Sequence, residues 1–543
     1  MLSLSRLAIA ASFLPQVLGA DWSGWGANIH NNRWVPSDTT TVTGESITTL
    51  THFCTISYPI GASATPVIKD DTAYFPTWDG TLTAINYKTC RMIWQINIAE
   101  LIAGYAPTSP AQASVMPAVA RTSPQIHGDI LFFGTQIHAL VVALNRTNAL
   151  TLDIIQLSPH PFAAITQSPT FYDGKLFVGT SSYEHIAALD AEYPCCSFHG
   201  TFAALEFDAE TGFSVAWNLS TIPEARVSQG WAGASVWGSQ PSIDEARRRV
   251  FVGTGNAYVV PADVRICQRW NNLTAFVSNA HDPCLPGDVW QDSVVAVDID
   301  TGKVAWAFQT PGVDAYVAAC GYPGLAEVDE KLCPQVPGPD ADFGMAPAFV
   351  PERDLLVVGR KNGHLYSLLA ENGTVAWESR VGQGGIGGGL AWGVAVDEVA
   401  VYYAVINTGY LEWRLTPSNI TVNASAYGAA SLDDGRILWQ TAVPRGGVCH
   451  APPTVVGDLV LVARTGQVTR ENTAYDETKG GLVALNKRIG RVALDYDLPS
   501  NAHSGIAVQG EYVLLGTGYR RPSPEAAVLG GFHVLTVDPA IVG

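Results

Sequence analysis

Charged side chains are scarce in this chain of 543 residues, at 15%, and basic ones are the scarcer kind, with 31 Lys and Arg against 49 Asp and Glu. The formal net charge is -18, and no Lys- or Arg-rich tract offsets it locally. Nucleic-acid binding draws its affinity from clustered basic residues. We therefore expect no nucleic-acid partner for this protein.

The chain also lacks a hydrophobic run long enough to cross a bilayer, so we expect no membrane span. The apolar stretch of residues 7–14 is too short, and Pro15 follows it. Because Arg6 precedes this stretch and the small Ala20 stands at a suitable cleavage point, residues 1–20 are predicted to be a secretory signal peptide. The mature protein is then expected to be secreted and extracellular.

Cysteine is too rare for a fold held mainly by disulfides, with nine in the whole chain. That number suits a large secreted domain with local disulfide bonds, and, being odd, it leaves at least one thiol unpaired unless another chain takes it. No C-x-x-C-H motif is present, which excludes a covalently attached haem of that type. Six N-x-S/T sites fit a secretory glycoprotein: Asn145, Asn218, Asn272, Asn372, Asn419 and Asn423.

Glycine (52), proline (33), tryptophan (15) and tyrosine (19) are plentiful, as is typical of a turn-rich, all-β protein. Many of these residues recur at fixed places in a repeated pair of strands. In each copy a short apolar strand, a tight turn and a second apolar strand end in Gly and a polar residue, and residues 230–256, GWAGASVWGSQPSIDEARRRVFVGTGN, carry one full unit. Eight copies open at residues 64, 122, 167, 239, 346, 390, 450 and 503, and most continue into a third strand, an Asp- or Asn-rich turn and a Trp.

Eight units of four strands predict an eight-bladed β-propeller, with a solenoid as the alternative. The propeller is favoured because the last unit ends after its third strand. The segment Asp21 to Pro36, which has no unit of its own, could supply the missing outer strand and close the ring. No low-complexity linker divides the chain, so residues 21–543 are predicted to form one domain. The insertions 257–290 and 311–344 are expected to form a lid or rim on one face.

Motifs inside the repeats indicate a protein family more specifically than the repeats themselves do. The tail AxDxxTGxxxW, VGTGN in the fourth unit and RKNGHLY in the fifth resemble the eight-bladed quinoprotein alcohol dehydrogenases, which bind pyrroloquinoline quinone (PQQ) and Ca²⁺. YPCCSFHG, AVWGS, GTGN and GPDADFG are similar to a secreted fungal branch that resembles polyvinyl alcohol dehydrogenase. The resemblance covers essentially the whole mature chain.

This resemblance implies four cofactor contacts. Trp237 would be the ring on which the quinone stacks, which suits a planar tricyclic cofactor. Arg121 and Thr166 would contact the cofactor carboxylates, and Lys361 would reach the quinone oxygens. Each residue also has a plainer interpretation: Trp237 as a core residue between blades, Arg121 in a rim ion pair, Thr166 as an ordinary strand residue and Lys361 as a solvated turn lysine.

The resemblance also implies a Ca²⁺ site and a general base. Glu184 and Asn256 match the metal ligands, and their oxygens suit this cation. Asp288 and Asp292 in LPGDVWQDSVVAVD are the candidates for the base. Asp288 is favoured, also as a metal contact, because it keeps the PGD context. A carboxylate held ionised near Ca²⁺ could take the alcohol proton as hydride moves to the quinone. The alternatives are a turn residue at Asn256 and a solvated loop carboxylate at Glu184.

Three features depart from the family pattern. His199 stands where an Arg is expected, and Ser63 where a carboxylate is common. The vicinal pair Cys195 and Cys196 lies in the third unit rather than the second. These cysteines could form a disulfide with each other near the cofactor, pair elsewhere, or stay reduced.

The expected function is a secreted oxidoreductase that oxidises an alcohol group of a small molecule or polymer with PQQ and Ca²⁺ and passes the electrons to a separate acceptor. Two alternatives stay open: an oxidoreductase of a fungal secondary-metabolite pathway, and a propeller without cofactor that acts as a binding or scaffold module. Retention of Trp237, Glu184, Asn256 and Lys361 together favours the enzyme, and the departures favour the scaffold.

Overall fold

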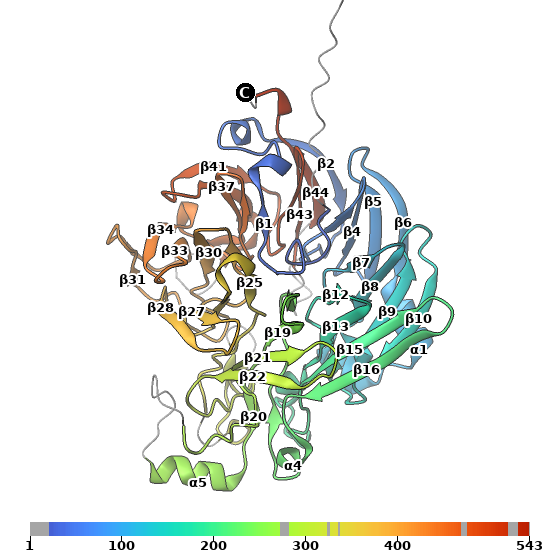
Figure 1. Cartoon of the computed structure of the whole chain (residues 1–543), viewed down its shortest axis with the longest axis vertical. Helices are drawn as coiled ribbons and strands as arrows, with labels where there is room; N and C mark the ends of the chain where they lie inside the picture. The colour runs from blue at the N-terminus through green and yellow to red at the C-terminus, as the bar shows by residue number, and fades with distance from the viewer. Residues whose placement is uncertain are drawn as a thin grey trace, which may run out of the picture.

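Eight antiparallel sheets follow one another along the chain and close into a ring (Figure 1). The computed structural model describes residues 21–541 apart from 272–281, 323–325, 335–336, 469–474 and 520–529. Seven of the sheets have four strands each. The remaining one, the seventh along the chain, has a fifth, short strand at its edge. The predicted all-β, eight-bladed β-propeller is confirmed, and the solenoid is excluded because strands of the first and last sheets contact each other.

The blades are built from strands that are nearly all consecutive in the chain. Blades 1 to 4 contain β3 (Val67–Lys69), β4 (Thr72–Pro76), β5 (Thr81–Asn86) and β6 (Arg91–Asn97); β7 (Gln125–His127), β8 (Ile130–Gly134), β9 (Leu140–Asn145) and β10 (Thr151–Gln156); β12 (Thr170–Tyr172), β13 (Lys175–Gly179), β15 (Thr201–Asp208) and β16 (Gly212–Ser220); and β18 (Ser242–Asp244), β19 (Arg249–Gly253), β21 (Ser293–Asp298) and β22 (Val304–Gln309). Blades 5 to 8 contain β25 (Ala348–Val350), β26 (Leu355–Gly359), β27 (His364–Leu369) and β28 (Val375–Arg380); β29 (Ala395–Val396), β30 (Ala400–Val405), β33 (Ala426–Ser431) and β34 (Ile437–Ala442); β36 (Thr454–Val456), β37 (Leu459–Arg464), β40 (Gly481–Asn486) and β41 (Val492–Asp497); and β42 (Ala507–Gln509), β43 (Tyr512–Thr517), β44 (Gly531–Thr536) and β2 (Thr51–Ser57).

The remaining elements are short. The helices are α1 (Ile98–Tyr105), α2 (Pro110–Val115), α3 (Glu184–Ala187), α4 (Glu224–Val227) and α5 (Ala262–Trp270). None of the described helices is long and apolar enough to cross a membrane. Small ribbons pair β11 (Ala163–Ala164) with β14 (Ser181–Ser182), β17 (Ala232–Gly233) with β20 (Ala257–Val259), β23 (Cys320–Tyr322) with β24 (Ala326–Val328), β31 (Trp413–Arg414) with β32 (Thr421–Val422), and β35 (Gly447–Val448) with β38 (Gly466–Val468) and β39 (Tyr475–Asp476).

Tryptophans at the ends of the repeats join neighbouring blades. The indole N–H of Trp306 in β22 donates to the carbonyl of Ala370 in the next blade at 3.1 Å, and a Cβ at Gly373, where φ is +74°, would lie 2.4 Å from the same ring. The glycine turn of one repeat therefore accommodates the Trp of the preceding one, which explains why both recur. The same indole-to-carbonyl bond is made by Trp94, Trp217, Trp377 and Trp439.

An N-terminal strand does complete the last blade, but it is not the predicted one. β2 (Thr51–Ser57) pairs with β44 as the outer strand of blade 8. A disulfide between Cys54 in β2 and Cys90 at the edge of blade 1 ties the two ends of the ring together. The prediction that Asp21 to Pro36 fills this position is wrong, because that segment pairs with the first strands of several blades instead.

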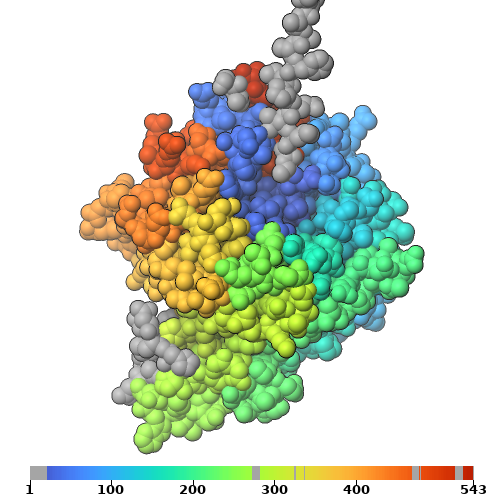
Figure 2. Space-filling model, viewed as in Figure 1, coloured from blue at the N-terminus to red at the C-terminus, as the bar shows by residue number. Residues whose placement is uncertain are grey.

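Residues 21–36 cover one mouth of the central channel. Carbonyls of this segment accept hydrogen bonds from the first strands of blades 4, 5, 6 and 7, at Ile243, Phe349, Val396 and Val455. In the space-filling view the dark blue N-terminal residues lie over the middle of the ring (Figure 2). A cavity of about 310 Å³ remains on this face, where the segment meets the strand turns of blades 5 and 6.

Arg33 anchors this cover. Its guanidinium is fully buried and donates to the carbonyls of Trp25, Pro453 and Ile506 and to the hydroxyls of two threonines. A buried guanidinium left without acceptors is costly, so the five partners fix the segment in this position.

Four disulfides and one free thiol account for all nine cysteines: Cys54–Cys90, Cys195–Cys196, Cys267–Cys284, Cys320–Cys333 and the buried, unpaired Cys449. The expected pattern of local disulfides with one thiol left over is confirmed. The vicinal cysteines are bonded to each other, so of the three alternatives for this pair the first holds.

Removing the ring-closing disulfide by Cys54→Ser together with Cys90→Ser should destabilise the protein by on the order of 2–4 kcal/mol, because β2 is then held only by noncovalent contacts. The readout is the thermal unfolding midpoint followed by circular dichroism. Cys320→Ser with Cys333→Ser is the matched control. It opens a span of 13 rather than 36 residues inside an insertion and should have the smaller effect. An unchanged midpoint for the Cys54 and Cys90 variant would contradict this role.

Candidate functional site

The open mouth of the channel collects equivalent positions from every blade. Loops that enter the first strand and loops that leave the second strand of a blade face the same end of the ring, opposite the strand turns near residues 21–36. Arg121, Thr166 and Trp237 precede first strands, and Asn256 and Lys361 follow second strands. The fold therefore brings these predicted residues to one mouth.

Trp237 is held rigidly there. The hydroxyl of Thr166 donates to the carbonyl of Trp237 at 2.6 Å, and His185 packs edge-on against the indole with ring centroids 5.3 Å apart. A Cβ at Gly255 would lie 2.6 Å from Trp237 Nε1, so only glycine permits this approach. Trp237 Nε1 is buried without a partner among the described residues. Thr166 thus positions Trp237. The N–H of the half-buried indole can still donate a hydrogen bond to a ligand.

Arg121 belongs to blade 2, and its guanidinium reaches across the mouth to blade 6. Its guanidinium stands 5.3 Å from the ring centre of Trp392 in blade 6, and Tyr183 hydrogen-bonds to it. Within the described part of the chain, no carboxylate forms an ion pair with Arg121. A cation held among aromatic rings with no counter-ion suits an anionic, planar ligand.

Lys361 stands between two buried carboxylates. Its ammonium is 3.0 Å from Asp340 Oδ1 and 2.7 Å from Asp342 Oδ2. The backbone N–H of Asn256 donates to Asp342 Oδ1 at 2.6 Å, and a Cβ at Gly255 would lie 2.9 Å from the same oxygen. Gly255 touches Trp237 as well, so the charged cluster adjoins the indole.

Burial sets the protonation of this cluster. Burial raises the pKa of Asp340 to about 7, although the charge of Lys361 opposes the rise. Burial alone would lower the pKa of Lys361, but Asp340 and Asp342 outweigh it and raise that pKa well above the ordinary value. Lys361 is therefore a permanent cation, while Asp340, whose pKa burial raises to about 7, is poised to exchange a proton near neutral pH.

Sequence reasoning assigned no role to Asp340 or Asp342, although it noted their motif GPDADFG. They stand on the loop that leads into the first strand of blade 5, the position that Trp237 occupies in blade 4. Asp314, in the same insertion, accepts hydrogen bonds from the backbone N–H groups of Asp340 at 3.0 Å and Ala341 at 2.6 Å and so shapes this loop. Their spacing from the first strand of blade 5 is the sequence signal that could have identified Asp340 and Asp342.

Neither predicted base candidate contacts Trp237 or Lys361 among the described interactions. Asp288 is half exposed and pairs with Arg226 at 3.0 Å, near α4. Asp292 is fully buried and pairs with Arg360 at 2.6 Å. The charge of Asp292 is thus engaged by Arg360, and that of Asp288 by solvent and Arg226. A role of Asp288 or Asp292 as the base stays a prediction, and Asp340 and Asp342 are the carboxylates that lie beside Lys361.

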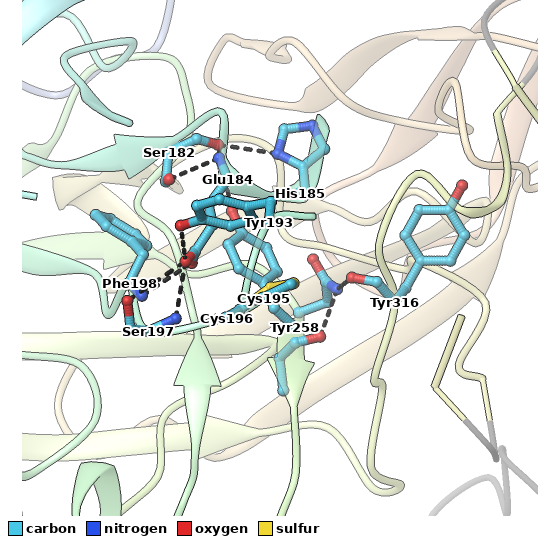
Figure 3. The surroundings of a disulfide bond; sticks show 12 residues. Ser182, Glu184, His185, Tyr193, Cys195, Cys196, Ser197, Phe198, Tyr258 and Tyr316 are labelled. Carbon is cyan, nitrogen blue, oxygen red and sulfur yellow. Dashed lines mark hydrogen bonds between the residues drawn. A yellow bond between two sulfur atoms is a disulfide. The ribbon is translucent and has the colours of Figure 1, made fainter. Parts of the chain in front are cut away.

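The Glu184 carboxylate is occupied by protein donors (Figure 3). Its Oε1 accepts from the Tyr193 hydroxyl at 2.7 Å and the Ser197 N–H at 2.8 Å, and its Oε2 accepts from the Phe198 N–H at 2.9 Å. His160 Nε2 lies 3.3 Å from Oε1. Burial alone would raise the pKa of Glu184, but the bonds from His160 and Tyr193 outweigh it and lower that pKa. Glu184 therefore fastens the loop that carries Cys195–Cys196, which lies close by in the view.

The calcium set predicted from the resemblance is not assembled. Glu184 and Asp342 each have both oxygens engaged by protein donors, and the side-chain amide N–H groups of Asn256 bind the carbonyls of Ala257 and Tyr316 at 2.7 and 2.8 Å. In the described regions no three His, Cys, Asp or Glu side chains are grouped to hold a metal. Ca²⁺ takes six to eight oxygen ligands, more than Glu184 and Asn256 supply, so the described residues alone do not complete the predicted Ca²⁺ site. The quinone, by contrast, fits Trp237 and Arg121.

Glu184→Gln should loosen the 193–198 loop, because a side-chain amide turns an N–H toward the backbone N–H groups that the carboxylate now accepts. We expect a loss of about 1–3 kcal/mol and faster amide exchange at Ser197 and Phe198. A carboxylate with a lowered pKa stabilises the fold above its unfolded pKa, and this stabilisation fades as the pH falls through the folded value. The deficit of the variant should therefore shrink in acid. Glu192→Gln, an exposed neighbour, should change nothing; equal exchange in both variants would contradict the role.

Comparison with known proteins agrees with this fold. Residues 291–521 match the family model described as outer membrane protein assembly factor BamB. A polyvinyl alcohol dehydrogenase of Sphingopyxis sp. (strain 113P3) is 30% identical over 94% of this chain and 75% of that protein. A polyvinyl alcohol dehydrogenase of Pseudomonas sp. is 29% identical over 78% of this chain and 60% of that protein.

Solved structures show the same ring. A europium-containing methanol dehydrogenase superposes with a TM-score of 0.64 at 14% identity, covering 95% of this chain and 98% of the other. Such low identity supports the fold alone. The relationship rests on the 30% identity that extends over three quarters of a polyvinyl alcohol dehydrogenase, together with the eight blades, and by these measures the chain belongs to the quinoprotein alcohol dehydrogenase family.

Proposed function

We propose that this protein oxidises the alcohol group of a small molecule with bound PQQ, and that the Asp340 and Asp342 carboxylates take the alcohol proton. The observation that carries the proposal is the placement of both carboxylates around Lys361, directly beside the indole of Trp237. When bound, the quinone supplies the acceptor for the hydride.

The charges of the cluster suit this task. Two carboxylates and one ammonium leave a single negative charge, which one alcohol proton neutralises. With a pKa of about 7, Asp340 is matched to proton transfer at neutral pH, and the charge of Lys361 favours its ionised form. The buried setting strengthens these interactions relative to water.

Different residues would contact different parts of the cofactor. Trp237 offers an indole face for stacking, and the unpaired Arg121 offers a cation for a carboxylate. Thr166 acts through Trp237, whose carbonyl accepts its hydroxyl, rather than through the cofactor. The predicted use of Ca²⁺ is no part of these steps, and its test is whether added Ca²⁺ changes PQQ affinity.

We further propose that the chain is secreted, is glycosylated and passes electrons to a separate acceptor. Four disulfides support an oxidising compartment. Three of the predicted glycosylation sites, Asn218, Asn372 and Asn419, are exposed, whereas Asn272 lies outside the described residues. A fungal secondary-metabolite role differs from this proposal only in the substrate. Mass spectrometry of protein recovered from the culture medium tests both its secretion and its glycosylation.

Asp340→Asn and Asp342→Asn should each lower alcohol-dependent dye reduction by on the order of 10²- to 10⁴-fold, because an amide cannot accept the proton. PQQ binding, measured by absorbance after gel filtration, should persist in both. Asp288→Asn is the matched control and should keep full activity, since Asp288 faces Arg226 and solvent. Full activity in both cluster variants would refute the assignment of the base.

Activity of the wild type should rise as the pH increases through about 7, because the base must be deprotonated and burial places the pKa of Asp340 there. A kcat/KM profile against pH measures this inflection. Asp340→Asn should lose it, while Asp288→Asn should retain it.

Binding of PQQ separates the enzyme from a scaffold. Trp237→Ala and Arg121→Gln should each weaken PQQ binding by at least about tenfold, because each removes a stacking face or a charge partner. Titration of PQQ followed by tryptophan fluorescence measures the affinity, with and without Ca²⁺. If the wild-type chain binds no quinone under any of these conditions, the scaffold alternative holds.

A further inference from the structure

We infer that the half of the open mouth away from Trp237 is a binding surface for planar aromatic substrates. Five side chains from blades 1, 8, 7 and 6 form it, and we call them the aromatic arc: Trp78, Tyr519, His503, His450 and Trp392. The inference rests on the proposed function, for which it names the class of alcohol.

Repeat symmetry places the arc at the same mouth as the cofactor residues. Trp78 and Tyr519 stand two residues after the second strands β4 and β43, as Lys361 does after β26. His450 and His503 stand four residues before first strands, as Arg121 does before β7. Positions equivalent in the repeat open at the same end of a propeller, so the arc and the cofactor site share one entrance.

Four rings of the arc, Trp78, Tyr519, His503 and His450, form a continuous chain. Trp78 meets Tyr519 edge-on at 4.9 Å between centroids. Tyr519 stacks on His503 at 4.5 Å with the planes 24° apart, and His503 stacks on His450 at 5.2 Å and 25°. This is the geometry of aromatic pairs that attract one another, and it presents ring faces rather than scattered side chains.

The arc differs from the structural tryptophans of the fold. Each repeat-tail indole gives its N–H to the neighbouring blade, whereas Trp392 Nε1 is buried with no partner among the described residues. Tyr519, His503, His450 and Trp392 are all partly exposed. Partly exposed, stacked rings beside an indole N–H without a partner among the described residues are suited to a ligand.

The chemistry of the arc selects the ligand. No Asp, Glu or Lys belongs to the arc, and the guanidinium of Arg121 lies over Trp392, 5.3 Å from its ring centre. Ring faces favour a planar, conjugated skeleton, and the Trp392 N–H can bind a hydroxyl or ether oxygen on it. An aromatic primary alcohol meets both requirements, whereas a saturated chain such as polyvinyl alcohol offers no ring to stack.

Calorimetry with a matched pair of alcohols tests this inference without any cofactor: naphthalen-2-ylmethanol and its fully saturated decahydro analogue. The wild type should bind the aromatic alcohol on the order of three- to tenfold more tightly than the saturated one. Tyr519→Ala should abolish this preference, whereas Tyr519→Phe, which keeps the ring, should retain it. His30→Ala, a ring at the opposite mouth, is the control and should change nothing.

Equal binding of the two alcohols by the wild type, or an unchanged preference in Tyr519→Ala with an unchanged unfolding midpoint, would overturn the inference. If Tyr519→Ala fails to fold, His503→Ala takes its place. Failure of the proposed function is a distinct result: the aromatic preference would persist while PQQ titration gave no binding.

Discussion

The bond between a tryptophan at the end of one blade and a carbonyl of the next is the interaction on which the rest of this structure depends. It recurs at five blade junctions, from Trp94 to Trp439, and buries a large ring while satisfying its only polar atom. Because glycine turns receive four of these rings, the angle between blades is set locally and repeats around the circle. The ring then fixes which loops meet at each mouth.

A rigid frame allows charges to be buried where they would otherwise be avoided. Breaking a buried ion pair by removing one partner is strongly destabilising, yet such pairs add little net stability. The Asp292–Arg360 pair and the Asp340–Lys361–Asp342 cluster lie in the same region of the molecule. Their concentration at one mouth is better explained by chemistry than by folding, since the apolar blades already supply the core.

The two mouths of the channel have opposite roles. One is covered by residues 21–36, with Arg33 as the anchor. The other is lined with aromatic rings, and Trp237 Nε1 and Trp392 Nε1 are buried there without a partner among the described residues.

The sequence by itself determined the parts that recur: eight strand units, the turn glycines and tryptophans that join them, and the family to which Trp237, Asn256 and Lys361 point. Periodic residues report local contacts, which repeat with the chain. Tertiary structure alone decided that β2 and not residues 21–36 completes the last blade, that Glu184 holds a loop, and that Asp340 and Asp342 flank Lys361. These contacts join irregular segments far apart in sequence, where no period exists to predict them.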